Sequence, residues 1–198
     1  MRARRRSAPV SPAIGWEHVL PTKEQRYFAR PTRGGRPVAI CVPCCNEDRK
    51  EVEMTIGSLA MQEIPPGFYL DIVILADGLL PMAASMREYL SEQFGLDWDN
   101  LPPQQTIIVD RPADVSVTTQ ANDWTDAKYF GQTCPRSAPI SVSLLLKRVN
   151  QRKANSHHWF FGAHARDIEA DYAFTTDCGT IFDRRCLGLL VRTECHRI

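Results

Sequence analysis

The sequence predicts an α/β fold, with a mostly parallel open sheet flanked by helices. Short apolar segments of strand length alternate with longer segments whose apolar residues recur at helical spacing. The strand segments are apolar at nearly every position, which is typical of parallel strands covered on both faces. The 198 residues, 43% hydrophobic and 24% charged, fit a globular domain that can bury a core. No apolar run is long enough to predict a transmembrane helix.

Charge divides the chain into two parts. Residues 1–37 carry nine Lys/Arg and two Glu, whereas residues 38–198 carry fifteen Lys/Arg and twenty-one Asp/Glu. The basic start is rich in proline and has no periodic apolar face, and it lacks the apolar stretch of a secretory signal. We therefore predict a disordered arm at residues 1–36 and one domain at 37–198. We expect no nucleic-acid partner.

The domain opens with a strand and a helix. Residues 37–42 are all apolar and predict a buried strand. Apolar residues at helical spacing predict a helix at 48–62, with either Asn46 or Asp48 as its N-cap.

The later elements continue this alternation, which requires crossover connections and hence parallel strands. Residues 110–139 show no usable pattern and are too long for a routine connector. Around them we expect strands at 70–75, 106–109, 141–146 and 172–176, and helices at 81–94 and 155–170.

The cysteines predict no special site. There are seven, an odd number, and only Cys41 and Cys44 form a C-x-x-C pair. That pair lies at the end of an apolar run and has no second pair with which to complete four tetrahedral ligands. We expect reduced thiols rather than a zinc or redox site.

Polar residues follow several predicted strands, where an open parallel sheet binds its ligands. Residues 43–48 contain two acids, Asp77-Gly78 follows the second strand, and Asp177 follows the last. With the basic residues at 147–153, these carboxylates suit a metal-bound phosphorylated ligand. Taken singly, each group has a simpler interpretation as a turn, a helix cap or a solvated loop residue, including Lys147 and Lys153.

Several common sites are absent from the sequence. It contains no G-x-G-x-x-G, no G-x-x-x-x-G-K-[ST] and no G-x-S-x-G. A dinucleotide-binding, P-loop or serine-hydrolase site is therefore not predicted.

One continuous run of residues is more informative about function than these separate groups. Residues 147–161 read K-R-V-N-Q-R-K-A-N-S-H-H-W-F-F. This run closely resembles the K-x-x-N-x-x-K-x-N-S-H-x-W-x-F signature of chitin synthases, processive family-two glycosyltransferases with a GT-A catalytic domain. Three shorter motifs occur in family order. Residues 43–47 are similar to P-x-Y-N-E, residues 76–78 to S-D-G and residues 177–180 to D-x-G-T.

The resemblance implies a nucleotide-diphosphosugar transferase that moves N-acetylglucosamine from its UDP donor onto a growing β-1,4 chain, with inversion. It implies that Pro43 and Glu47 border the uracil, Asp77 contacts the nucleoside and Lys153 approaches the nucleotide. It also implies that Asp177 helps to hold Mn²⁺ or Mg²⁺ on the diphosphate, where the ion stabilises the leaving group. Finally, the resemblance implies that the pocket for the donor is shaped by three further residues, Asn155, Ser156 and His157.

The sequence departs from the family pattern in several places. Cys45 stands where the family usually has Tyr, which removes a stacking contact with the base, and Ala154 replaces a bulkier aliphatic residue. The family's later E-D and Q-x-x-R-W motifs and its membrane helices have no counterpart. We therefore expect the donor-binding half of a truncated GT-A domain, with no catalytic base. The resemblance places the enzyme at the plasma membrane, reached only through segments that this sequence lacks.

Two other interpretations remain open. One is a non-catalytic nucleotide-sugar-binding or interaction module. The other is a different processive transferase of the hyaluronan or cellulose synthase type, which the N-S-H-x-W run disfavours.

Overall fold

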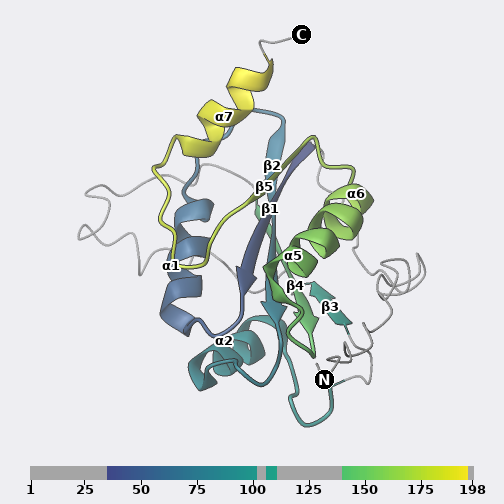
Figure 1. The fold of residues 1–198 in the computed structure, drawn as a ribbon. Coiled ribbons are helices and arrows are strands. Elements are labelled where there is room, and N and C mark those ends of the chain that lie inside the picture. The colour runs from purple at the N-terminus through teal and green to yellow at the C-terminus, as the bar shows by residue number, and fades with distance from the viewer. Residues whose placement is uncertain (1–34, 102–105, 111–139, 196–198) are drawn as a thin grey trace, which may run out of the picture.

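A computed structural model describes residues 35–101, 106–110 and 140–195 (Figure 1). The predicted arm and the unpatterned segment therefore fall almost wholly outside the described residues. Within them lies one five-stranded sheet in the order β3-β4-β2-β1-β5. All neighbouring strands are parallel except the antiparallel pair β3–β4. The elements are β1 (Arg36–Cys44), α1 (Arg49–Ala60), β2 (Phe68–Asp77), α2 (Ala84–Phe94), β3 (Thr106–Asp110), β4 (Ile140–Lys147), α5 (Arg152–Trp159), η3 (Phe160–His164), α6 (Ala165–Asp167), β5 (Tyr172–Thr175) and α7 (Cys186–Cys195).

This architecture confirms the predicted α/β fold with a mostly parallel sheet, and every predicted strand and helix is present. Two differences concern helices. The helix predicted at 155–170 begins at Arg152, and its middle turn, η3, is a π-helix. Helix α7 was not predicted from the sequence at all.

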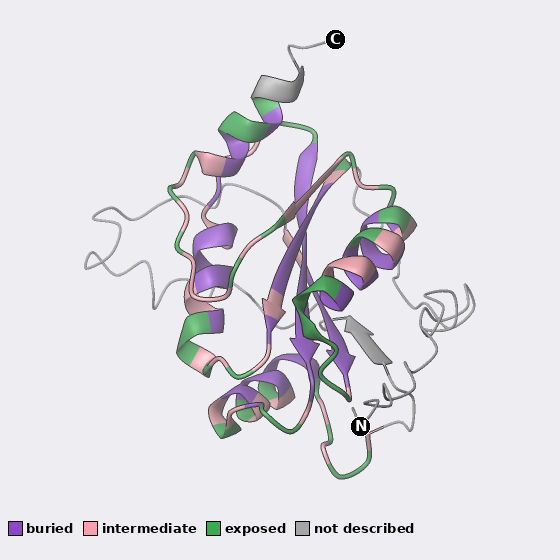
Figure 2. Cartoon of the chain, in the orientation of Figure 1, coloured by how far each residue is buried: buried purple, intermediate pink, exposed green. Residues whose placement is uncertain are grey.

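Helices cover both faces of the sheet, and a separate apolar core lies under each (Figure 1). Alternate strand residues such as Val38, Ile72 and Leu144 pack under α1, α2 and α7. The intervening residues, such as Val73 and Leu145, pack under the helix that runs from α5 to α6. The central strands are accordingly buried along their length, whereas the outer faces of the helices are exposed (Figure 2). Burial on both sides explains the continuous apolar runs in the sequence.

Two aspartates of β2 attach the α5–α6 helix to the sheet. The Asp77 carboxylate accepts a hydrogen bond from the backbone N–H of Gln151, 2.9 Å away, just before the helix begins. Near its other end, His164 Nε2 lies 2.8 Å from Asp71 Oδ1. Six residues of strand and thirteen of helix both extend about 20 Å, so the two contacts match in spacing. The helix is therefore held in one position along β2.

Helix α7 is attached to the end of α1 through a buried glutamine. Gln62 Oε1 accepts from the backbone N–H of Leu187 at 3.0 Å, and its Nε2 donates to the Asp183 carbonyl at 2.8 Å. Gly188 lies so close to this segment that a Cβ there would clash with the carbonyl oxygen of Glu63. Only glycine therefore permits this approach.

Candidate functional site at the carboxyl edge of the sheet

The predicted site residues follow four neighbouring strands. Because β4, β2, β1 and β5 are adjacent and parallel, their carboxyl ends meet at one edge of the sheet. The loop after β1 carries Glu47, and Asp77 ends β2. The 147–153 segment begins at the last residue of β4, and Asp177 follows β5. The structure therefore brings the four motifs to one edge, where open α/β sheets bind ligands.

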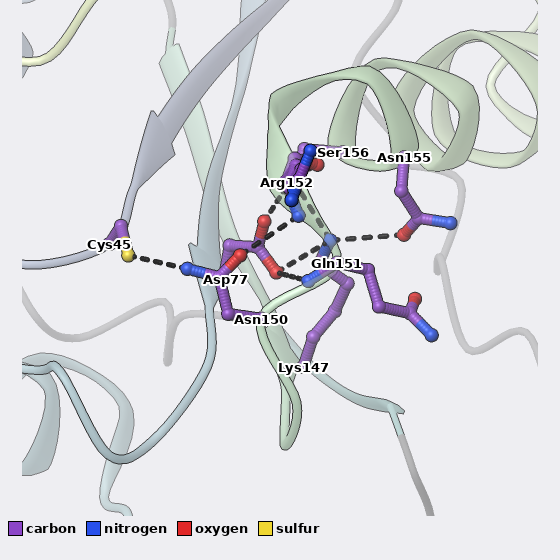
Figure 3. Close-up of polar contacts among 8 residues, drawn as sticks. All are labelled: Cys45, Asp77, Lys147, Asn150, Gln151, Arg152, Asn155 and Ser156. Carbon is purple, nitrogen blue, oxygen red and sulfur yellow. Dashed lines mark hydrogen bonds and ion pairs between the residues drawn. The ribbon is translucent and has the colours of Figure 1, made fainter. Parts of the chain in front are cut away.

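The centre of this edge is a buried ion pair between Lys147 and Asp77 (Figure 3). The Lys147 ammonium lies 2.8 Å from Asp77 Oδ1, and the two side chains are 2% and 6% exposed. It also donates to Asn155 Oδ1 and to Ser156 Oγ, each at 3.0 Å. The Ser156 hydroxyl in turn donates to Asp77 Oδ2 at 3.3 Å. Three acceptors thus surround the three N–H donors of the ammonium, which compensates its loss of water.

Burial lowers the pKa of Lys147 from its usual 10.5, while hydrogen bonding and charge attraction from Asp77 act to raise it. Desolvation is the larger effect, which is the expected order for an ammonium withdrawn from water. The sequence interpretation of Lys147 as a solvated loop residue was therefore wrong. The reason is register: Lys147 is paired directly with Asp77 across β2 and β4. No local pattern in the sequence reports that pairing.

A close approach of two loops shapes the edge beside this network. Gly78 has φ of +100°, and a Cβ there would lie 2.9 Å from the backbone nitrogen of Asn150. The Asn150 side chain donates from Nδ2 to Cys45 Sγ, 2.9 Å away, and accepts from the backbone N–H of Arg152. Asn150 thus links the β1 loop to the start of α5 (Figure 3).

A second ion pair lies at the surface, between Lys153 and Asp177. Their side chains are 53% and 73% exposed, so both charges are accessible to a ligand. The two come from the first turn of α5 and from the loop after β5. Surface pairs of this kind contribute little to stability, so the pair can open at small cost.

The remaining predicted residues have different settings. Glu47 folds back, and its Oε2 accepts from the backbone N–H groups of Cys45 and Asn46. Its neighbour Asp48, not Asn46, caps α1 in a capping box with Glu51. Pro43 is half-buried at the end of β1. The half-buried His157 ring meets Phe161 edge-on, with 6.4 Å between ring centroids.

The structure thus sorts the predicted residues into an inner and an outer group. Asp77, Asn155 and Ser156 share the buried Lys147 network, whereas Lys153 and Asp177 meet at the surface. Asp77 makes its contacts inward, to the lysine and to the start of α5.

A metal ion could find only a partial set of ligands here. Among the described residues, no group of three or more His, Cys, Asp or Glu side chains could hold a metal. Asp177 nevertheless offers an exposed carboxylate. One carboxylate is enough for an ion such as Mg²⁺ when phosphate oxygens and water complete its shell. The residues therefore fit a metal that arrives with a phosphorylated ligand, not a preformed cage.

Two thiols, Cys44 and Cys178, also lie near each other at this edge, which the sequence interpretation did not foresee. The neighbouring Cys178 thiol, together with burial, raises the pKa of Cys44 well above its ordinary value. Spacing along the chain gave no signal, because the two residues come from β1 and from the loop after β5.

An open parallel sheet with its polar residues at the carboxyl edge is the arrangement of a nucleotide-binding α/β protein. The model of the chitin synthase-like glycosyltransferase domain matches residues 70–194. The chain therefore belongs to the chitin synthase-like glycosyltransferase family, as its motifs predicted.

Individual relatives agree with this assignment. Chitin synthase 1 of Botryotinia fuckeliana is 28% identical over 109 residues, which are 55% of this chain and 57% of the relative. Chitin synthase 3 of Verticillium dahliae is 39% identical over 49 residues, 25% of this chain and 6% of the relative. Chitin synthase 1 of Phytophthora sojae is 26% identical over 181 residues, 78% of this chain and 18% of the relative. The chain thus spans less than two thirds of each of these relatives. None of the helices in the described residues has the length and apolar character needed to cross a membrane.

Proposed function

We propose that this chain provides the donor side of a chitin synthase-like hexosyltransferase and binds UDP-N-acetylglucosamine at the carboxyl edge of its sheet. The observation that carries this proposal is the exposed Lys153–Asp177 pair, positioned beside the buried Asp77–Lys147 network in a chain of this family. Transfer of the sugar to a glycan acceptor at the plasma membrane is proposed for the whole enzyme.

Lys153 and Asp177, the two charges of the surface pair, each have a separate role in donor binding. A diphosphate entering at this edge offers Lys153 a partner of higher charge than a single carboxylate, so the ammonium turns from Asp177 to the phosphate oxygens. Asp177 is then free to ligate a divalent ion. When bound, Mn²⁺ or Mg²⁺ would neutralise charge on the UDP leaving group.

The buried network positions these groups. Asp77 fixes the first turn of α5 through the Gln151 N–H and through Ser156. Lys153 belongs to that same turn, so its backbone is held while its side chain stays exposed at the surface. We assign Asp77, Asn155 and Ser156 this supporting role, and we assign Pro43, Glu47 and His157 to the wall of the nucleoside pocket.

The test is a calorimetric titration of the purified chain with UDP-N-acetylglucosamine and with UDP, with and without Mn²⁺. We expect Mn²⁺ to strengthen binding and Asp177→Asn to remove that gain. Loss of a charged ligand contact of about 1.5–3 kcal/mol corresponds to about 10- to 100-fold in affinity.

Asp171→Asn is the matched control. Asp171 is also an exposed acid paired with a cation, since its Oδ2 lies 2.9 Å from Arg36 Nε, but it precedes β5 and lies at the opposite edge of the sheet. Binding that is equally weakened by both substitutions would overturn the assignment of Asp177. No binding by a chain shown to be folded would favour the non-catalytic interaction module.

A further inference from the structure

The further inference concerns Arg152, the first residue of α5. Its side chain is exposed, and it directly precedes Lys153 of the surface pair. Its backbone N–H donates to Asn150 Oδ1 at 2.9 Å, and its carbonyl accepts from Ser156 Oγ at 3.5 Å. Arg152 therefore stands at the carboxyl edge, tied by its backbone to a residue of the buried network (Figure 3).

The segment 147–153 carries four cations, and three of them have partners in the structure. Lys147 and Lys153 each face an aspartate, and Arg148 donates to a backbone carbonyl at 3.1 Å. Within the part of the chain that the structure describes, no hydrogen bond or ion pair engages the Arg152 guanidinium. An incoming anion can therefore bind this cation without displacing a partner, whereas the other three would each have to give one up.

The backbone of Arg152 has an unfavourable conformation. Its φ of +69° lies in the left-handed region, which residues with a Cβ disfavour and which glycine accepts readily. Among the described residues, the one other non-glycine residue with positive φ is Glu169, at +54°. An exposed arginine alone would be ordinary protein surface. An exposed arginine kept at a strained position has no packing reason to be there, and strain of this kind is concentrated at ligand sites.

We propose that Arg152 is a second phosphate-binding cation of the donor site, which makes the site prefer nucleoside diphosphates to monophosphates. This inference rests on the proposed function, in which Lys153 turns to the phosphates and Asp177 to the metal. The ammonium of Lys153 is a compact point charge, whereas a guanidinium is a planar fork that can hold two phosphate oxygens at once. A diphosphate engages both neighbouring cations, and a monophosphate engages Lys153 alone.

Calorimetric titration of the whole chain with UDP and with UMP, both in Mn²⁺, tests this preference. Arg152→Gln removes the charge but keeps a long side chain on the same strained backbone. We expect it to weaken UDP binding about 10-fold, through loss of a charge-assisted hydrogen bond, and to change UMP binding less than about twofold. Arg152→Lys should recover part of the UDP affinity, because it restores the charge without the fork.

Arg166→Gln is the matched control. Arg166 is also an exposed arginine of the α5–α6 helix, with its side chain 57% exposed, but it lies near the opposite end of that helix. The control should leave both affinities unchanged. Three results would overturn the inference: unchanged UDP binding in Arg152→Gln, equal weakening of UDP and UMP, or equal effects of the two substitutions.

The strained backbone supplies a second readout. Arg152→Gly removes the guanidinium and the strain together, so it should raise the urea midpoint of unfolding by about 0.3 M while it weakens UDP binding. Glu169→Gly relieves the same kind of strain just beyond α6, so it should raise the midpoint and leave UDP binding unchanged. An arginine kept for stability predicts the reverse, and a lower midpoint in Arg152→Gly would refute the ligand role.

Inorganic pyrophosphate separates this inference from the proposed function, because it offers two phosphates without nucleoside or sugar. Suppose that the folded chain binds pyrophosphate, loses that affinity in Arg152→Gln and does not bind UDP-N-acetylglucosamine. Arg152 would then stand as a diphosphate-binding residue, and the donor assignment would fall. Binding of UDP-N-acetylglucosamine that is indifferent to Arg152→Gln would leave the proposed function standing and overturn the inference. A folded chain that binds neither ligand would overturn both.

Discussion

The buried Lys147 ammonium gives the sharpest test of how the site is built. We consider Lys147→Met, which keeps most of the side-chain length but removes the charge. In the variant, the Asp77 carboxylate stays buried and keeps its hydrogen bonds from Gln151 N–H and Ser156 Oγ, but it loses the ammonium at 2.8 Å. Asn155 Oδ1 also loses its donor at 3.0 Å.

The magnitude follows from these contacts. Removing one partner of a buried ion pair costs about 3–5 kcal/mol, and the two remaining hydrogen bonds to Asp77 favour the lower end of that range. With a urea dependence of about 2 kcal/mol per molar, the unfolding midpoint should fall by about 1.5 M or more. Urea unfolding followed by circular dichroism measures this shift.

A double variant separates the charge from the packing. Asp77→Asn combined with Lys147→Met removes both charges, and the amide oxygen of the introduced asparagine can still accept from Gln151 N–H. We expect the double variant to be more stable than Lys147→Met alone, because no buried charge is left uncompensated. A loss below about 1 kcal/mol in the single variant, or a double variant whose loss equals the sum of the two single losses, would refute this account of the network.

Two further predictions concern the cores. Burial raises the pKa of Cys41 from 9.0 to about 12, so its thiol stabilises the fold below pH 9.0 and loses that contribution between pH 9.0 and about 12. From about pH 8 to pH 10, the free energy of unfolding should fall by about 1.4 kcal/mol more in the wild type than in Cys41→Ala; parallel profiles would contradict this. Gly188→Ala, whose Cβ would clash with the Glu63 carbonyl oxygen, should cost about 2–3 kcal/mol in chemical unfolding. Gly95→Ala, with φ of +66° and nothing within 4 Å of its Cβ, should cost only about 1 kcal/mol, and equal losses would argue against the steric cause.

Local sequence signals predicted the elements well. The uninterrupted apolar run of β2 reflects a strand buried at every position, and Asp48 with Glu51 three residues later marked the start of α1. Helix α7 was missed. What holds it in place is Gln62, from a distant part of the chain, together with the close approach of Gly188.

The candidate site was predictable in outline and not in its inner contacts. Motifs that follow successive parallel strands must share one edge of the sheet, so Asp77, Lys153 and Asp177 were expected there. Which of them would be buried was not predictable, because nothing near Lys147 in the sequence distinguishes it from Lys153.

The sequence by itself thus determined the fold class, the family and the edge at which its polar residues gather, because these depend on hydrophobic periodicity and on local motifs. Only the tertiary structure decided that Lys147 lies opposite Asp77. This pairing is set by the register between strands that lie far apart in the chain. Register is fixed by the packing of whole strand faces against the helices, and no short segment of sequence contains that information.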